Sequence, residues 1–349
     1  MSSPMSLSAP PALPATVSKQ DSLLHRAFVA RELGIVVALV ALLAVTTAKN
    51  SRFLETQSIQ DLLLGASILV ILAIGQTCVV ITKNVDLSVG SVLGLVAFAV
   101  GKFFVTWPHA NLLVALVIGL GMGLACGVVN GALIAVAKVP ALVITLGTLY
   151  VFRGLDYSWA SGQQINAADM PASFLRLGTR TLLGVPVLAI VAVVVLVAAG
   201  IVLRSYRSGR ELYAIGSDAT AARLSGIPVS RRVFAAFAVS GALAGLAGVM
   251  YAARFGTIDA SAGNGIELQV VAAAVVGGVA IVGGSGSVWG AALGALLLTT
   301  IGSSLSVLQI TPFWQQAING ALILAAIGLD RLLALRLASS LRGGRPHGA

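Results

Sequence analysis

Long apolar segments separated by short polar stretches constrain this chain more than any other feature. Each segment approaches the roughly 20 residues that an α-helix needs to cross about 30 Å of hydrocarbon. Apolar residues fill these segments instead of recurring every 3.6 residues beside a polar face, a pattern typical of membrane-spanning helices. We count ten segments, at about 33–48, 62–82, 87–106, 111–137, 140–155, 181–203, 233–252, 267–284, 288–309 and 313–329.

Composition excludes a soluble globular protein. Apolar residues make up 58% of the 349 positions and charged residues only 10%, whereas a soluble domain has about 25% charged residues. The 39 glycines favour closely packed helices over a β-barrel, whose strands would alternate in polarity. We therefore expect an all-α polytopic membrane helical bundle of about ten transmembrane helices.

The formal net charge of +10 has a topological explanation. With the amino terminus inside and ten spans, 15 of the 22 Lys and Arg residues fall on the cytoplasmic side, as the positive-inside rule requires. We accordingly expect no nucleic-acid partner and place both termini in the cytoplasm. The predicted parts are a disordered cytoplasmic tail (1–30), a transmembrane domain (31–332) with a cytoplasmic loop (204–232), and a cytoplasmic tail (333–349).

The two halves of the chain share short motifs. The sequence NGALI occurs at 130–134 and again at 319–323, and acidic residues open corresponding spans at 85–87 (VDL) and 266–268 (IEL). In the predicted topology the span after Asp86 runs outward and the span after Glu267 runs inward. This predicts inverted repeats, an arrangement used by transporters; chance similarity among helices rich in Gly, Ala and Leu is the alternative.

The cytoplasmic loop contains a predicted short helix over 217–226. Ser217 is the expected N-cap, Asp218 suits the positive helix end, and Gly226 is the expected stop before Pro228. Because a linker needs no helix, this one favours docking on a cytoplasmic partner. The alternative is an interfacial helix on lipid headgroups, supported by the arginines that flank it.

Asp86 and Glu267 each admit two interpretations. A carboxylate near a span is costly and faces a cavity, a partner or the interface, so each is a candidate for lining or gating a pathway. Both residues also stand where an apolar run opens, where a carboxylate accepts the free N–H groups of a helix start.

Several other motifs have structural explanations. The glycines of 283–286 predict a tight cytoplasmic turn, because the only Gly-Lys pair, at 101–102, lacks the Ser or Thr of a phosphate-binding loop. Cys78 and Cys126 have no metal-site spacing and are expected to be buried thiols. Three Gly-xxx-Gly pairs, beginning at Gly123, Gly241 and Gly290, predict close helix packing.

A series of short motifs runs through most of the chain: NVDLSVGS (84–91), NG (130–131), VPA (139–141), TLGT (145–148), RG (153–154), AIG (214–216), AARLSGI (221–227), GGSGSVWG (283–290) and PFWQQ (312–316). In these motifs and their order the chain resembles the permease subunits of bacterial ABC importers for simple sugars, of the ribose, xylose, rhamnose and autoinducer-2 type. Lys83 and the two residues after it depart from the glycines that usually precede the Asp-Leu-Ser motif, which favours the rhamnose and autoinducer-2 branch.

This resemblance implies a translocation subunit of a binding-protein-dependent sugar importer in the bacterial cytoplasmic membrane. It is not itself an enzyme: ATP and Mg²⁺ belong to a separate ATP-binding subunit, and this chain binds no cofactor or metal. A second permease subunit and an extracytoplasmic sugar-binding protein complete the expected partners. The residues expected to couple to the ATP-binding subunit are Ser217, Asp218, Ala221, Ala222, Arg223, Leu224 and Gly226.

Candidate pathway residues are polar or aromatic side chains near span ends. A sugar ring can stack on Trp314 and bond the neighbouring amides, although interfacial anchoring also explains this tryptophan. The full set is Asp86, Ser88, Asn130, Thr145, Thr148, Glu267, Trp314, Gln315, Gln316 and Asn319.

The sequence also bears on two other classes of function, secondary transporters and intramembrane enzymes. An ion-coupled secondary transporter of a small polar solute, with Asp86 or Glu267 as proton carrier, is the main alternative. An intramembrane enzyme would need a nucleophile–base pair or a metal cluster within the spans, and the sequence shows neither. Branched-chain amino acid permeases belong to the same broad family, but the sugar-type motifs around Asp86 and Trp314 argue against that branch.

Overall fold

The computed structural model describes residues 18–137 and 139–311 and individual positions between 313 and 328, with 18–32, 136 and 137 described by their backbone alone. The α-helices are α1 (Ser18–Lys49), α2 (Thr56–Val80), α3 (Val89–Thr106), α4 (Leu112–Ala137), α5 (Ala141–Ala160), α6 (Ala172–Thr179), α7 (Val187–Ser205), α8 (Arg207–Ser217), α9 (Ala219–Leu224), α10 (Val229–Phe255), α11 (Ile266–Val276) and α12 (Val288–Val307). Two 3₁₀ turns, η1 (Ser51–Leu54) and η2 (Ala167–Asp169), and one hairpin, β1 (Thr181–Leu182) with β2 (Val185–Pro186), complete the elements.

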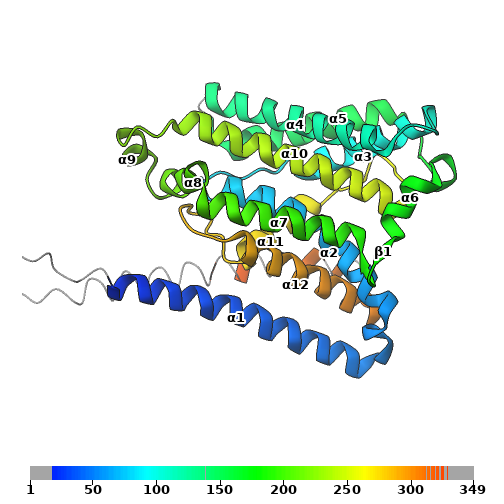
Figure 1. Ribbon diagram of the computed structural model, residues 1–349, viewed down its shortest axis with the longest axis horizontal. Coiled ribbons are helices and arrows are strands. Elements are labelled where there is room, and N and C mark those ends of the chain that lie inside the picture. The colour runs from blue at the N-terminus through cyan, green and yellow to red at the C-terminus, as the bar shows by residue number, and fades with distance from the viewer. Residues whose placement is uncertain are drawn as a thin grey trace, which may run out of the picture.

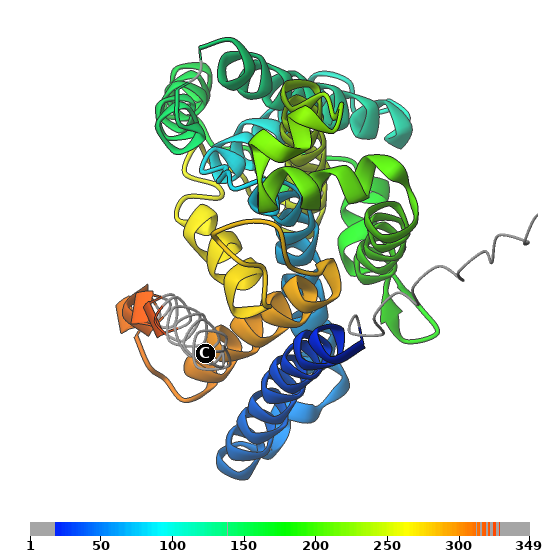
Figure 2. The same cartoon turned by 90° about the vertical axis from the view of Figure 1, so that its left-hand side faces the viewer.

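The long helices lie side by side along one axis and form a single bundle (Figure 1). Helices α8 and α9 lie at one end, called here the α9 end, and α6 lies at the other, called the α6 end. Helix α1 packs on the outside of the bundle against α12 (Figure 2). Among the described residues, six helices are long and apolar enough to span a membrane: α2, α3, α4, α7, α10 and α12. The expected helical membrane bundle is confirmed, and the count of ten spans is not.

Some predicted boundaries differ from the structure. Helix α1 begins at Ser18, so residues 18–30 are helical. The apolar run 267–284 contains the 11-residue helix α11 followed by irregular backbone, because several of the glycines after Val276 adopt positive φ angles. The hairpin occupies the start of the expected span 181–203. Within the last predicted span, 313–329, the structure describes only individual positions, so it does not test this span.

The centre of the bundle depends on glycines where helices cross. A Cβ atom on Gly123 of α4 would overlap the carbonyl oxygen of Gly241 of α10, and one on Gly241 would overlap that of Gly123. The third predicted pair also packs closely: a Cβ atom on Gly290 of α12 would overlap the Gly277 carbonyl, and one on Gly294 would overlap the Ala273 carbonyl of α11. Backbones approach this closely only where side chains are missing, so the packing role of all three motifs is confirmed.

We expect Gly123→Ala to destabilise the protein by about 1–3 kcal/mol, because the added methyl group must push α4 away from α10. Gly121→Ala is the matched control in the same helix, since a Cβ there meets no atom within 4 Å. Thermal unfolding of the two purified variants in one detergent measures the difference. Equal melting temperatures would contradict the crossing as a determinant of stability.

Candidate functional site

The backbone is not helical in two segments that lie against the interior of the bundle. Residues 81–88 join α2 to α3, and residues 256–265 join α10 to α11. Helix α3 then runs toward the α6 end, whereas α11 runs toward the α9 end (Figure 1). Each segment contains an Asp-x-Ser turn, in which Ser88 N–H donates to Asp86 Oδ1 at 3.0 Å and Ser261 N–H donates to Asp259 Oδ1 at 2.7 Å. The two segments thus lead into helices that run in opposite directions, which agrees with the inverted-repeat prediction.

Asp86 is buried, with 1% of its surface exposed. Its Oδ1 also accepts a bond from Ser88 Oγ at 2.7 Å, and its Oδ2 accepts one from Ser240 Oγ, near the middle of α10, at 3.0 Å. The Gln76 amide of α2, with its nitrogen facing the Asp86 carbonyl, pairs with the Asp86 backbone at 3.0 and 3.3 Å. The N-cap of α3 is Ser88, so Asp86 is an anchor of the broken segment and not the cap of its helix.

Two further helices contact the same segment. Asn130 Nδ2 of α4 donates to Ser88 Oγ at 2.8 Å, and Thr145 Oγ1 of α5 donates to the Val85 carbonyl at 3.2 Å. Thr148 is bonded within α5, to the Thr145 carbonyl at 3.3 Å. The structure therefore brings the predicted residues Asp86, Ser88, Asn130 and Thr145 into one buried cluster.

Gln76 and Ser240 belong to this cluster but were missed from sequence. Both are polar residues inside otherwise apolar spans, a position that carries a cost unless a partner is present. Their isolation within the spans 62–82 and 233–252 is the signal that could have identified them.

Glu267 lies apart from the Asp86 cluster. It is the second residue of α11, and a Cβ on Gly90, in the first turn of α3, would overlap its carboxylate. Its carboxylate forms no hydrogen bond or ion pair with the described residues. Because Asp86 precedes its helix while Glu267 lies inside one, the predicted equivalence of 85–87 and 266–268 is wrong; the Asp-x-Ser turns correspond better.

The second broken segment is held by α5. Arg153 Nη1 donates to the carbonyls of Ala260 at 2.9 Å and Ala262 at 2.7 Å. Asp156 lies one turn further along α5, with an oxygen 3.9 Å from Arg153 Nη1. A buried arginine bonded to two carbonyls fixes an irregular segment that has no helical bonds of its own.

Of the predicted aromatic and amide residues near the carboxyl terminus, Trp314 and Gln316 are not in this cluster. Trp314 is 64% exposed and Gln316 is also exposed. Gln315 and Asn319 lie outside the described residues.

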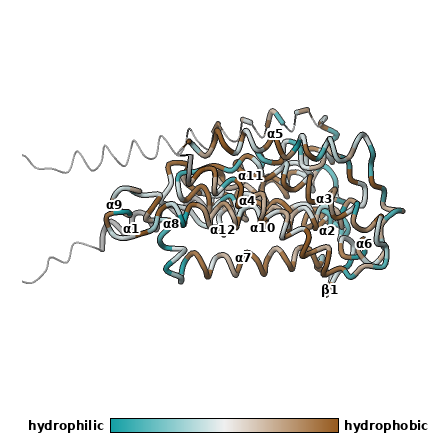
Figure 3. Tube along the Cα trace, turned by 90° about the horizontal axis from the view of Figure 1, so that it is seen from above, coloured by the Kyte–Doolittle hydropathy of each residue, from teal (hydrophilic) through white to brown (hydrophobic). Residues whose placement is uncertain are grey.

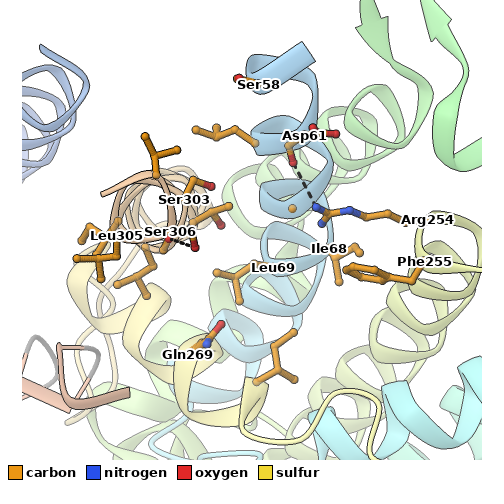
Figure 4. Close-up of a pocket in the computed structure, with 18 of the residues that line it drawn as sticks. Ser58, Asp61, Ile68, Leu69, Arg254, Phe255, Gln269, Ser303, Leu305 and Ser306 are labelled. Atoms are coloured by element: carbon orange, nitrogen blue, oxygen red, sulfur yellow. Dashed lines mark hydrogen bonds between the residues drawn. The ribbon is translucent and has the colours of Figure 1, made fainter. Parts of the chain in front are cut away.

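A cavity of about 740 Å³ lies between α2, α10, α11 and α12, and sequence reasoning did not predict it. Arg254 of α10 lines this cavity, and its Nη2 donates to the carbonyl of Asp61 in α2 at 3.3 Å (Figure 4). Gln269 and Ser303 add polar groups from the facing helices. Its volume is in the range of small-molecule sites, which combine an apolar lining with a few polar groups.

The cytoplasmic helix predicted over 217–226 is α9 (Ala219–Leu224), and a further helix that was not predicted, α8 (Arg207–Ser217), precedes it. Asp218 is the N-cap of α9, in place of the expected Ser217, and its Oδ1 accepts bonds from Ala221 N–H at 3.0 Å and Thr220 N–H at 2.8 Å. These backbone bonds hold the pKa of Asp218 below its usual range. Gly226, with φ of 80°, follows the end of α9 as expected.

The coupling candidates differ in exposure. Ala222 is 4% exposed and therefore packs inside the fold, whereas Leu224 is 86% exposed. Ala221 and Arg223 are exposed beside it. The outer face of α9 is thus a small surface of exposed side chains at the tip of the bundle (Figure 1).

Helix α8 is fastened by a buried carboxylate. Glu211 accepts bonds from Arg207 Nε, at 2.7 Å, and from Arg232 Nε of α10. The bond from Arg207, followed by that from Arg232, lowers the pKa of Glu211. Since the pKa is lowered, the stabilisation is present above the ordinary carboxyl pKa and is lost only as the pH falls through the lower, folded-state value.

The far end of α8 contacts two irregular loops at the α9 end: residues 81–88, which lead into α3, and residues 277–287, which join α11 to α12. A Cβ on Gly216 would overlap the Ile81 carbonyl and the Gly284 amide, which are bonded to each other at 2.9 Å. Tyr213 Oη donates to the Gly286 carbonyl at 3.0 Å, and Lys83 Nζ donates to the Ser217 carbonyl at 3.4 Å. A shift of α8 and α9 must therefore move the loop that leads into Asp86 and the loop that follows α11.

We expect Asp86→Ala to destabilise the protein by about 3 kcal/mol, because it leaves the Ser88 and Ser240 hydroxyls buried without an acceptor. Asp86→Asn retains one acceptor oxygen, so its loss is expected to be smaller, about 1 kcal/mol. Thermal unfolding in detergent compares the two. If the two variants unfold at the same temperature, hydrogen bonding by Asp86 is not what holds the segment.

Comparison with known proteins identifies the family. The family described as "Branched-chain amino acid transport system / permease component" matches residues 58–327. The autoinducer 2 import system permease protein LsrC of Escherichia coli (strain K12 / DH10B) is 36% identical over 312 residues, which cover 89% of this chain and 90% of that protein.

Two further relatives carry the same name. The protein of Enterobacter sp. (strain 638) is 35% identical over 86% of each chain, and that of Klebsiella pneumoniae is 36% identical over 88% of each chain. No solved structure matches the chain. With six candidate spans in the described residues and a family match over most of its length, this chain is a multi-pass inner-membrane protein and belongs to the family of ABC importer permeases.

Proposed function

We propose that this chain forms the translocation pathway of an ATP-driven, binding-protein-dependent importer for a monosaccharide or a related small polyol, such as an autoinducer-2-like molecule. The observation that carries the proposal is the contact of α8 with the loops 81–88 and 277–287, through Gly216, Tyr213 and Ser217. A separate ATP-binding subunit, a second permease subunit and an extracytoplasmic binding protein complete the importer.

The exposed face of α9 is the proposed docking site of the ATP-binding subunit. Leu224 is a large apolar side chain that is 86% exposed beside the exposed Arg223, and arginine is one of the residues enriched among those that dominate the energy of protein interfaces. Nucleotide-driven movement of the partner would pass through α9 to α8 and then to the Asp86 segment. ATP binds and is hydrolysed in the partner, and this chain holds no cofactor.

The α9 end is assigned to the cytoplasm, together with both termini. Helices α8 and α9 and the start of α10 carry Arg207, Arg210, Arg223, Arg231 and Arg232, and basic residues collect on the cytoplasmic side of membrane proteins. The cavity near Arg254 then opens toward the outer half of the membrane, where a binding protein would deliver solute. The relatives' name, autoinducer 2 import permease, favours a small hydroxylated solute.

We expect Leu224→Glu to weaken association with the ATP-binding subunit at least about tenfold, since it places a charge in the centre of the proposed interface. Leu183→Glu is the matched control, because Leu183 is 97% exposed in the hairpin at the opposite end. Co-purification with the ATP-binding subunit, and uptake of labelled autoinducer 2 and simple sugars by cells, are measured together. Ala222→Glu is avoided because Ala222 is buried.

The same cells distinguish the importer from an ion-coupled transporter. For the importer, uptake ends with ATP depletion, persists with an uncoupler, and falls with Leu224→Glu. Uptake that collapses with the uncoupler and with Asp86→Asn, while Leu224→Glu transports normally, would refute the proposal.

A further inference from the structure

Two cavities adjoin on the seam between α7 and α12. One, of about 560 Å³, lies at the α9 end and is lined by residues of α7, α8 and the start of α12. The other, of about 350 Å³, extends from it along α7, α12 and α2. Trp289, in the first turn of α12, lines both, so the two cavities meet at its side chain.

The cavity at the α9 end is basic. Arg204 comes from the last turn of α7 and Arg210 from the first turn of α8. Neither forms an ion pair with any carboxylate in the described part of the chain, and no acidic residue lines this cavity. Arg210 Nη1 is oriented by the Ser205 carbonyl at 2.9 Å. The nearest acidic residue of α8, Glu211, is already bonded to Arg207 and Arg232.

The start of α12 adds to this positive environment. Ser287 caps the 20-residue helix, accepting a bond from Trp289 N–H at 3.1 Å, and the N-terminus of a helix carries partial positive charge. Two arginines from different helices and one helix N-terminus thus surround a single cavity. A phosphate group is the ligand whose charge and oxygens fit this set.

The second cavity is apolar. Ala189, Ala192 and Val193 of α7 face Ala292, Leu293 and Leu296 of α12, and Ser67 is its one polar side chain. Small residues on both helices leave the groove open, and hydrophobic residues line α7 along most of its length (Figure 3). Its lining on α7 runs from Leu196 to Ala189, 7 residues of helix or about 10 Å, about two thirds of the half-thickness of a bilayer's hydrocarbon core, about 15 Å.

Trp289 connects the two environments. Its indole lies against Gly200, where a Cβ on the glycine would contact the ring at 2.9 Å, and 47% of the residue is exposed. Tryptophan in this position is typical of the level at which lipid headgroups meet acyl chains. A basic cavity, an interfacial tryptophan and an apolar groove match, in order, the phosphate, the glycerol level and the upper part of an acyl chain of a phospholipid.

We propose that this seam binds one anionic phospholipid, with its phosphate between Arg204 and Arg210 and one acyl chain along the groove between α7 and α12. The lipid would hold the end of α7 to the start of α12, beside the loop at Gly286 that α8 contacts through Tyr213. The ligand is chosen over free phosphate because the basic cavity adjoins, at Trp289, an apolar groove that an inorganic ion would leave empty. The proposal is independent of the transported solute.

The test measures lipid binding to the purified full chain by native mass spectrometry and by exchange into nanodiscs of phosphatidylglycerol or phosphatidylcholine. We expect one phosphatidylglycerol to be retained in preference to phosphatidylcholine. The double variant Arg204→Gln, Arg210→Gln should lose about 30-fold in that preference, since each basic residue at an anionic surface contributes about fivefold. The matched control is Arg223→Gln, Arg231→Gln, which removes the same charge from exposed positions at the same end.

A second variant tests the groove. Ala292→Phe fills the apolar cavity without changing charge, and it should weaken phosphatidylglycerol binding while leaving the melting temperature in lipid-free detergent unchanged. Soluble glycerol 1-phosphate should compete at least 100-fold more weakly than the lipid, because it has no acyl chain to bury.

Three results would overturn the proposal. Equal losses in the Arg204/Arg210 variant and the control would indicate a general surface charge effect. Competition by glycerol 1-phosphate as strong as by lipid, with no effect of Ala292→Phe, would indicate a phosphate site. Unchanged lipid preference with lost binding of the ATP-binding subunit would indicate a protein interface.

Discussion

The hydrogen bonds around Asp86 are the constraint on which the rest of this structure depends. A chain that interrupts a helix inside a membrane exposes backbone N–H and C=O groups, and hydrocarbon offers them no partners. Here Gln76 and Thr145 bond the backbone of the segment. Ser240 and Asn130 bond the side chains of Asp86 and Ser88, so the partners come from four different helices. The position of the broken segment therefore depends on the mutual positions of α2, α4, α5 and α10, and any rearrangement of these helices must break or exchange bonds there.

That dependence explains why the glycine crossing of α4 and α10 matters beyond stability. Gly123 and Gly241 set the distance between two of the four helices, and this distance decides whether Asn130 and Ser240 both reach the segment. Well-packed interfaces have discrete arrangements and do not deform continuously. A mechanical signal entering at α9 would thus be expected to switch the cluster between arrangements instead of stretching it.

The α9 end combines three features within one region: the exposed face of α9, the loops 81–88 and 277–287 bonded to α8, and the basic cavity at the start of α12. Tyr213 is shared between the last two, because its hydroxyl holds the Gly286 loop while its ring lines the cavity. Lipid and ATP-binding subunit would therefore act on the same loop from different sides. The opposite end is linked to the second broken segment instead, since Ile165, in the connection between α5 and α6, exchanges two backbone bonds of 2.9 Å with Ile258.

The sequence by itself determined the membrane class, most span positions, the glycine packing and the family, because apolar length, small-residue spacing and short motifs are local properties of a chain. It also identified Asp86, Ser88, Asn130 and Thr145 as candidates. Only the tertiary structure decided that these four meet, that Gln76 and Ser240 join them, and that Ala222 is buried while Leu224 is exposed. It likewise showed that α11 is short, that Asp218 caps α9, and that Arg204 and Arg210 face one cavity. These outcomes depend on contacts between residues far apart in the chain, and no local pattern records which helices become neighbours.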